Sequence, residues 1–273
     1  MVKIMNGIKK LTVSSFRKMK EQGGKIVVLT AYDAPTAAMA ADCGVEMLLV
    51  GDSVANAMLG YRNTLPLTLE ASLHHTAAVR RGAPDAFFVG DMPFMTYQAD
   101  ISEALKNAAR YLKEAGADAV KLEGGAAMAA TVERMVSTGI PVMGHIGLLP
   151  QKLMTAGGYK IAGKTDKEAA ALIKDAKTLE AAGAFSIVLE CIPAEVAKQI
   201  TAAVSIPTIG IGAGVHCDGQ VQVVNDLLGL SVGDFVPKHA KRYANLNEEI
   251  KKAFTQYVKD VKKAKFPDKD HSF

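Results

Sequence analysis

Short apolar segments alternate with amphipathic segments along most of the chain. Three apolar segments are near repeats, at residues 43–52, 115–123 and 182–190, where a glycine precedes a mostly apolar run that ends at a carboxylate. A glycine just beyond a helix favours the left-handed backbone that ends it, and short Val/Ile/Leu runs are typical of strands buried on both faces of a parallel sheet. The repeats lie about two strand–helix units apart, so the pattern predicts further units between them.

The same pattern gives the positions of the individual elements. Strands are predicted at residues 25–30, 47–51, 86–90, 119–122, 141–144, 186–189 and 206–210, with a weaker eighth strand at 234–236. Helices are predicted between them, among others at residues 70–81, 102–115, 167–182 and 194–204.

Eight strand–helix units in about 250 residues are typical of a (β/α)8 TIM barrel. A doubly wound open sheet is the alternative, but the turn after the first strand, at residues 30–33, lacks the glycine fingerprint of a dinucleotide site. We therefore predict one barrel domain over residues 1–273, with the barrel at 23–240. A helix at 13–22, within the N-terminal segment 1–22, would cover the barrel floor, and an amphipathic helix at 246–265 begins the C-terminal segment 246–273.

Composition narrows the class of protein. With 49% hydrophobic and 22% charged residues, the chain is typical of a globular protein. The net charge of +4 hides an uneven distribution: residues 1–20 carry +6, residues 241–273 carry +4, and the 220 residues between them carry −6. The three cysteines form no CxxC pair, which favours a reducing compartment.

No apolar run approaches the roughly 18 residues of a membrane span, and the start lacks the apolar core of a secretory signal. We expect a cytoplasmic protein with no membrane partner. A mitochondrial presequence is the alternative interpretation of the acid-free start. Nucleic-acid binding is disfavoured because the basic ends lack aromatic stacking partners and a binding motif.

Candidate chemistry lies where the predicted strands end. Active sites of TIM barrels lie at the carboxyl ends of the strands, and here those ends carry polar side chains. They are Asp52, Ser53, Asp91, Lys121, Glu123, His145 and Glu190. Lys121 and Glu123 are two residues apart, so they point to the same side of their strand.

Several carboxylates converging on one barrel mouth cannot all remain ionised without a cation, since each raises the pKa of the others. Oxygen ligands without a Cys or His cluster suit Mg²⁺. A 2-oxo acid could chelate such an ion, which would stabilise an enolate. Lys121 would then neutralise the substrate carboxylate, and a nearby carboxylate would remove a C–H proton.

At these residues the chain resembles the ketopantoate hydroxymethyltransferase family. The motifs that carry the resemblance include VGDS at 50–53, TLP at 64–66, DMPF at 91–94, VKLEGG at 120–125, GHIGLLPQ at 144–151 and LEC at 189–191. The resemblance implies a (β/α)8 barrel that transfers a hydroxymethyl group from 5,10-methylenetetrahydrofolate to 3-methyl-2-oxobutanoate through a Mg-stabilised enolate. The product, 2-dehydropantoate, is formed in the first step of pantothenate synthesis.

The resemblance also implies roles for individual residues. It assigns Asp52, Asp91 and Glu123 to Mg²⁺, and Glu190 to proton abstraction. Contacts to the oxo acid are implied for Asp52, Ser53, Asp91, Lys121 and His145. It further implies a homo-oligomer, a decamer in the family, in which the C-terminal segment would be exchanged or packed between subunits. Arg62 and Asn225 are mild departures from the family pattern.

Some features have two interpretations. A lyase or mutase acting on a Mg²⁺-bound 2-oxo acid would share the same residues, and dependence on a folate would separate the two. The GIGAG run at 210–214 resembles a phosphate loop, but a turn with close backbone approach is the simpler interpretation. Cys191 is interpreted as a small buried apolar side chain, because no base is placed beside it.

Overall fold

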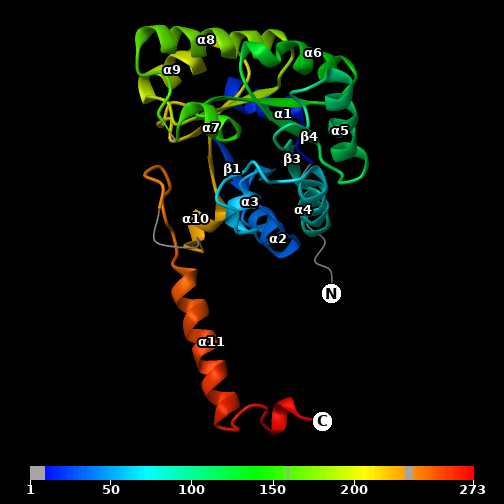
Figure 1. The fold of residues 1–273 in the computed structure, drawn as a ribbon, viewed down its shortest axis with the longest axis vertical. Helices are drawn as coiled ribbons and strands as arrows, with labels where there is room; N and C mark the ends of the chain where they lie inside the picture. Colours follow the sequence, from blue (N-terminus) through cyan, green and yellow to red (C-terminus); the bar gives the residue numbers. More distant parts are fainter. Residues whose placement is uncertain (1–9, 159, 231–235) are drawn as a thin grey trace. The chain divides into compact units, whose positions relative to one another are not determined.

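The structure is a computed structural model that describes residues 10–158, 160–230 and 236–273. Its centre is a closed barrel in which each strand pairs in parallel with the next and β1 pairs with β8 (Figure 1). The strands are β1 Ile26–Thr30, β2 Met47–Val50, β3 Phe87–Asp91, β4 Ala119–Glu123, β5 Val142–Gly147, β6 Ser186–Glu190, β7 Thr208–Ile211 and β8 Gly219–Gln222. The predicted (β/α)8 TIM barrel is confirmed.

Helices separate most of the strands in sequence, and others precede the first strand or follow the last. They are α1 Val13–Glu21, α2 Ala34–Asp42, α3 Val54–Ala57, α4 Leu69–Gly82, α5 Ile101–Lys113, α6 Ala129–Ser137, α7 Leu153–Ala156, α8 Asp166–Ala181, α9 Ala194–Ala203, α10 Val224–Leu228 and α11 Leu246–Lys262, with 3₁₀ turns η1 Ala126–Met128, η2 Pro150–Lys152 and η3 Lys269–His271. Side-chain caps fix several starts: Asp33 accepts from the backbone N–H of Thr36 at 2.8 Å and so begins α2.

The eighth strand was predicted in the wrong place. The barrel is closed by β8 at Gly219–Gln222, whereas the sequence favoured 234–236, a segment that falls mostly outside the described residues. The β8 sequence GQVQ is short and half polar, so it lacks the apolar run that marks the other strands. Its place is set by pairing with β1 and β7.

Two apolar layers hold the barrel together. The inner layer lies inside the barrel and includes Phe87 and Met143. The outer layer lies between the strands and the surrounding helices. Phe16 of α1 is fully buried in the inner layer, with its ring 4.9 Å from the ring of Phe87. The N-terminal helix therefore covers the amino-terminal end of the barrel, as predicted.

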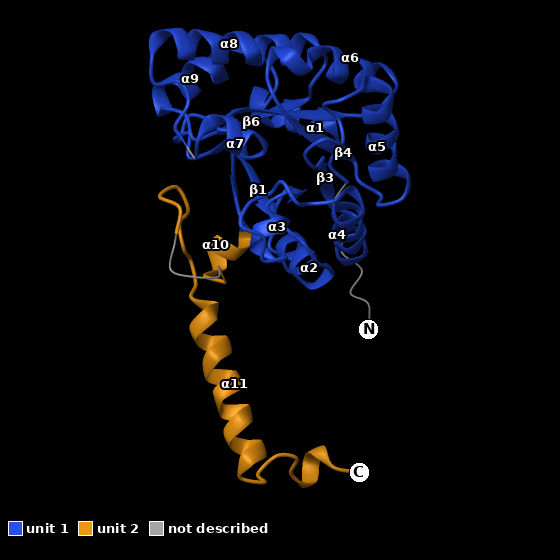
Figure 2. Ribbon diagram, in the orientation of Figure 1, with its two compact units in different colours: residues 1–223 blue, residues 224–273 orange. Residues whose placement is uncertain are grey.

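The chain forms two compact units, residues 1–223 and 224–273 (Figure 2). The first contains every barrel strand, and the second contains α10, α11 and the C-terminal turn. Among the described residues, no helix is long and apolar enough to cross a membrane.

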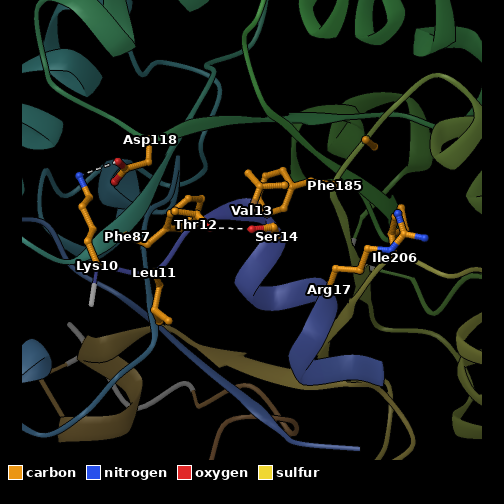
Figure 3. A pocket seen from close by; sticks show the side chains of 11 residues that line it. Lys10, Leu11, Thr12, Val13, Ser14, Arg17, Phe87, Asp118, Phe185 and Ile206 are labelled. Carbon is orange, nitrogen blue, oxygen red and sulfur yellow. Dashed lines mark hydrogen bonds and ion pairs between the residues drawn. The ribbon is translucent and has the colours of Figure 1, made fainter. Parts of the chain in front are cut away.

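A cavity of about 790 Å³ lies beside α1 at the barrel floor (Figure 3). Its lining includes Lys10, Thr12, Arg17, Phe87, Phe185 and Ile206. Both basic side chains are already paired, Lys10 with Asp118 and Arg17 with Glu21. The cavity thus gathers no group of ionisable side chains suited to chemistry, in contrast to the opposite end of the barrel.

Candidate active site at the barrel mouth

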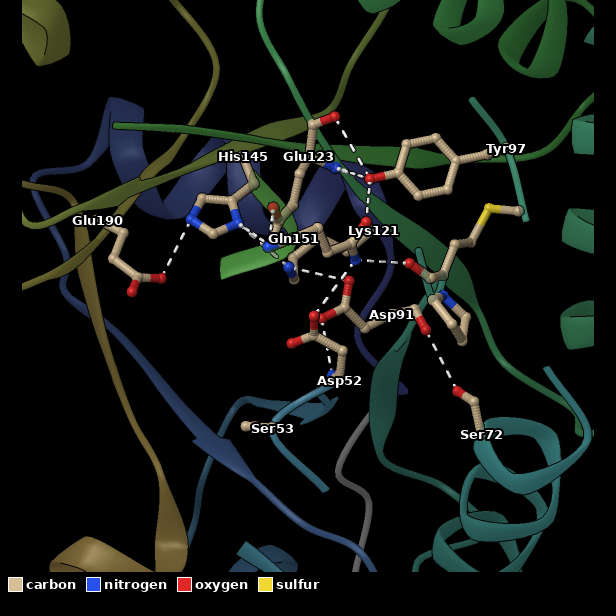
Figure 4. A network of polar contacts seen from close by, with 12 residues as sticks. Asp52, Ser53, Ser72, Asp91, Tyr97, Lys121, Glu123, His145, Gln151 and Glu190 are labelled. Atoms are coloured by element: carbon tan, nitrogen blue, oxygen red, sulfur yellow. Dashed lines mark hydrogen bonds and ion pairs between the residues drawn. The ribbon is translucent and has the colours of Figure 1, made fainter. Parts of the chain in front are cut away.

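Five consecutive strands bring the predicted site residues together at the carboxyl end of the barrel (Figure 4). Asp52 follows β2, Asp91 ends β3, Lys121 and Glu123 lie on β4, His145 lies on β5, and Glu190 ends β6. Apart from Glu190, each of these residues is at most 5% exposed. The side chain of Glu190 is 17% exposed, so it is the member of this group most open to a substrate.

Asp91 and Lys121 form a buried ion pair across β3 and β4. The Lys121 Nζ lies 2.9 Å from Asp91 Oδ1, while Asp91 Oδ2 accepts the backbone N–H of Asp52 at 2.9 Å. Behind them, the Tyr111 hydroxyl donates to the backbone oxygen of Asp91 at 2.8 Å. Asp91 is therefore fixed through its side chain and its main chain together.

The electrostatics of this group reflect burial and crowding of charge. Burial raises the pKa of Asp91 to about 6, against the opposing attraction of Lys121. Burial and the neighbouring charge of Glu123 also raise the pKa of Asp52. Burial disfavours the Lys121 ammonium, but the charges of Asp91, Glu123 and Asp52 outweigh it and hold the pKa of Lys121 above its usual value.

His145 lies between two carboxylates and the lysine. Its Nδ1 is 3.3 Å from Lys121 Nζ and 3.5 Å from Glu123 Oε1, and its Nε2 is 3.2 Å from Glu190 Oε2. The contact to Glu190 is an ion pair that is not aligned as a hydrogen bond. Burial and Lys121 act to lower the pKa of His145, but Glu123 and Glu190 overcome them and raise it to about 9.

Two residues without a predicted role complete the network. Gln151, in η2 after β5, contacts Asp52 and Glu123, and the Tyr97 hydroxyl contacts Gln151 and the backbone of Glu123. Gln151 belongs to the GHIGLLPQ motif, which is the signal in the sequence that points to it. Tyr97 lies in the loop after β3, and no pattern in the sequence singles it out.

Ser53 lies at the start of α3, and its hydroxyl is 2.7 Å from the hydroxyl of Tyr32. The 210–214 run covers the end of β7 and the turn after it, where a Cβ on Gly214 would lie 2.5 Å from the Cβ of Ala194. Close backbone approach therefore accounts for this glycine. For Cys191, burial and Glu190 raise the thiol pKa to about 11, which disfavours the thiolate that a nucleophile requires.

The mouth offers oxygen donors for a hard cation. Across the described ranges, no three His, Cys, Asp or Glu side chains are close enough to form a metal cluster as they stand. However, Glu123 Oε1 and Thr64 Oγ1 are buried without a hydrogen-bond partner among the described residues. Together with Asp52 and Asp91, these oxygens match the ligand preference of Mg²⁺, so the donor set fits this ion.

The closed parallel barrel, with its ionisable group at the carboxyl mouth, defines an enzyme of the TIM-barrel class. Solved structures share this fold. A phosphonopyruvate hydrolase in complex with oxalate and Mg²⁺ matches with a TM-score of 0.62 at 10% identity, over 96% of this chain and 93% of that one. A 2,3-dimethylmalate lyase of the PEP mutase/isocitrate lyase superfamily matches with a TM-score of 0.58 at 16% identity, over 95% and 91%.

Sequence comparison defines the family. The model of the ketopantoate hydroxymethyltransferase family matches residues 10–269. Relatives named 3-methyl-2-oxobutanoate hydroxymethyltransferase include those of Syntrophus aciditrophicus, 55% identical over 97% of both chains, and Thermotoga maritima, 54% identical over 96% of both chains. The chain belongs to the ketopantoate hydroxymethyltransferase family and is an enzyme of that family.

Proposed function

We propose that this enzyme forms 2-dehydropantoate from 3-methyl-2-oxobutanoate, with 5,10-methylenetetrahydrofolate as the donor of the one-carbon unit. The observation that carries the proposal is the placement of Glu190. It is the partly exposed carboxylate at the edge of a buried network, and His145 holds one of its oxygens at 3.2 Å. A carboxylate in this position can reach a substrate C–H while the buried groups hold the rest of the substrate.

Each residue of the mouth has a distinct part in the proposed reaction. Lys121 and His145 contact the oxo acid and place positive charge beside its carboxylate. Glu190 takes the proton from C3 of the oxo acid, which produces the enolate. The enolate carbon attacks the methylene carbon of the donor in its iminium form, which forms the new C–C bond. Hydrolysis of the remaining C–N bond leaves the water oxygen on that carbon as a hydroxymethyl group, and tetrahydrofolate leaves with one proton from water and the proton that Glu190 took from C3.

Asp52, Asp91 and Glu123 would hold Mg²⁺, whose bound charge would favour the enolate oxygen. Glu123 Oε1, which accepts no hydrogen bond among the described residues, supports this assignment. So does the Mg²⁺ in the phosphonopyruvate hydrolase structure, which has the same fold.

Hydrogen–deuterium exchange at C3 tests the assignment of Glu190. With Mg²⁺ and no folate, we expect the wild-type enzyme to exchange the C3 proton of 3-methyl-2-oxobutanoate in D₂O, as followed by NMR. Glu190→Gln should slow the exchange at least 100-fold, since general-base catalysis typically contributes about 10²- to 10⁴-fold. Glu195→Gln, on the exposed surface of α9, is the matched control and should exchange like wild type. Undiminished exchange in Glu190→Gln would refute the assignment.

Product formation tests the donor and the ion separately. We expect 2-dehydropantoate to appear only when both methylenetetrahydrofolate and Mg²⁺ are present. Unchanged turnover without the folate would remove the proposed donor and favour lyase or mutase chemistry, and unchanged turnover in excess chelator would remove the metal.

A further inference from the structure

Gln151 donates hydrogen bonds to two of the carboxylates at the barrel mouth. It is 5% exposed and lies in the loop between β5 and α7. Its backbone N–H donates to Glu123 Oε2 at 3.1 Å, and its side-chain Nε2 donates to Asp52 Oδ2 at 3.2 Å. One residue therefore reaches two carboxylates that come from different strands (Figure 4).

Tyr97, together with the neighbouring Gln98, orients the side-chain amide of Gln151. The Tyr97 hydroxyl accepts the backbone N–H of Glu123 at 3.0 Å and lies 2.7 Å from Gln151 Oε1. The Tyr97 hydroxyl donates to Oε1, and the side-chain Nε2 of Gln98 donates to the same oxygen at 3.0 Å, so Oε1 is the accepting end of the amide. The two Nε2 protons are then directed to Asp52 Oδ2 and, at 3.0 Å, to the backbone oxygen of Met92. A reversed amide would turn an oxygen toward each of these acceptors.

The two carboxylates that Gln151 connects repel each other, since the charge of Glu123 contributes to the raised pKa of Asp52. Gln151 supplies N–H donors to one oxygen of each without adding charge. The other oxygen of Glu123, Oε1, accepts no hydrogen bond within the described part of the chain. Gln151 thus restrains one oxygen of Glu123, while the other makes only the longer 3.5 Å contact with His145 Nδ1.

We propose that Gln151, oriented by the Tyr97 hydroxyl, is a positioning residue that sets the spacing of Asp52 and Glu123 for the divalent cation. The inference rests on the proposed function, because it assumes that these carboxylates bind the ion. Gln151 and Tyr97 do not touch the ion in this proposal. They act through the carboxylates, as groups that orient metal ligands commonly do.

Cation affinity, measured without folate and without turnover, is the test. Mn²⁺ is titrated into the folded, metal-free protein and the free ion is followed by electron paramagnetic resonance. Gln151→Met keeps the length of the side chain and removes both amide contacts, so we expect the Kd for Mn²⁺ to rise at least tenfold, within the 10- to 100-fold typical of outer-shell substitutions. Tyr97→Phe keeps the ring and should raise the Kd several-fold. Gln199→Met, on the exposed surface of α9, is the control and should stay within twofold of wild type.

Further measurements separate positioning from a loss of folding. The kcat of Gln151→Met should approach that of wild type at saturating Mg²⁺, while the Mg²⁺ concentration for half-maximal rate rises. Because Gln151 and Tyr97 share the 2.7 Å contact, the loss of Mn²⁺ affinity in the double variant should be smaller than the sum of the two single losses. If Gln151→Met does not fold, Tyr97→Phe carries the test.

The outcomes are distinct. A wild-type protein that binds neither Mn²⁺ nor Mg²⁺ would overturn the metal part of the proposed function. A wild-type protein that binds Mn²⁺, with either Gln151→Met or Tyr97→Phe at wild-type affinity, would overturn the positioning role alone.

Discussion

His145 makes the stability of the metal-free enzyme depend on pH. Its pKa is raised to about 9 by Glu123 and Glu190, above the ordinary value of 6.5, so folding favours the charged form. Its contribution to the free energy of unfolding is fully present below about pH 6.5 and is lost as the pH rises through about 9. A shift of this size corresponds to an effect on the order of 3 kcal/mol.

Urea unfolding in chelator, between about pH 6 and pH 9.5, measures this contribution. We expect the wild-type protein to lose stability across that range and His145→Gln to show a flatter profile. His216→Gln, exposed in the loop after β7, is the control and should keep the wild-type slope. The pKa of Asp91 is also raised, to about 6, so its contribution to the free energy of unfolding is lost as the pH rises through about 6. This loss occurs at lower pH than that of His145, so the two effects are separable. Identical profiles for His145→Gln and wild type would contradict the prediction.

The candidate site residues that lie on the strands or directly after them were predictable from the periodicity of the chain, whereas Tyr97 and Gln151, further into the loops, were not. Lys121 and Glu123 follow from the alternation of side chains along a strand whose end was visible in the sequence. Tyr97 and Gln151 lie in irregular segments, where no periodicity states which way a side chain points. Their positions depend on contacts between separate loops, such as the 2.7 Å contact between the two side chains.

At the scale of one strand, β3 connects packing to the site. Gly90 lies beside the ring of Tyr111, and a Cβ at this position would lie 2.3 Å from Tyr111 Cδ1. Gly90→Ala should therefore displace the ring whose hydroxyl supports Asp91, at a cost of about 1–3 kcal/mol in unfolding free energy. Urea unfolding measures the loss. In the control Gly144→Ala, the new methyl group would meet the end of the Leu179 side chain at 2.8 Å, which can move, so we expect a smaller loss. A larger loss in the control would contradict the argument.

The seven strands predicted from apolar runs are confirmed, whereas β8 was missed. Such runs mark β1 to β7 because these strands are largely buried between the inner and outer layers. In β8, Gly219 is required by close packing instead, since a Cβ there would lie 2.4 Å from the backbone oxygen of Ile26. A requirement imposed by a partner strand so distant in sequence leaves no local signal.

At the scale of the whole molecule, an exposed apolar face of α11 bears on assembly. Ile250, Phe254, Tyr257, Val258 and Val261 follow helical spacing on one face, and each is at least 38% exposed. We propose that the enzyme is a homo-oligomer in which subunits cover this face, because monomeric proteins rarely leave a continuous apolar stripe in water.

Light scattering coupled to size-exclusion chromatography tests this proposal. We expect the wild-type chain to elute as an oligomer and the double variant Phe254→Ser, Tyr257→Ser to elute as a smaller species. Lys252→Ser, exposed on the same helix, is the control and should assemble like wild type. A wild-type mass of about 29 kDa, that of one chain, would contradict the proposal.

The pairing of β1 with β8 has a consequence for how the chain is made. The acid–base residues Asp52 to Glu190 all lie in β2 to β6 or directly after one of these strands, so they are all synthesised before Gly219. Until then the sheet has two open edges, β1 and β7, and open edges invite pairing with other chains. β8 supplies none of the acid–base residues described above. Its contribution is to cover the open edges of β1 and β7. A nascent chain that stalled before residue 219 would contain all of those residues but could not close the barrel that positions them.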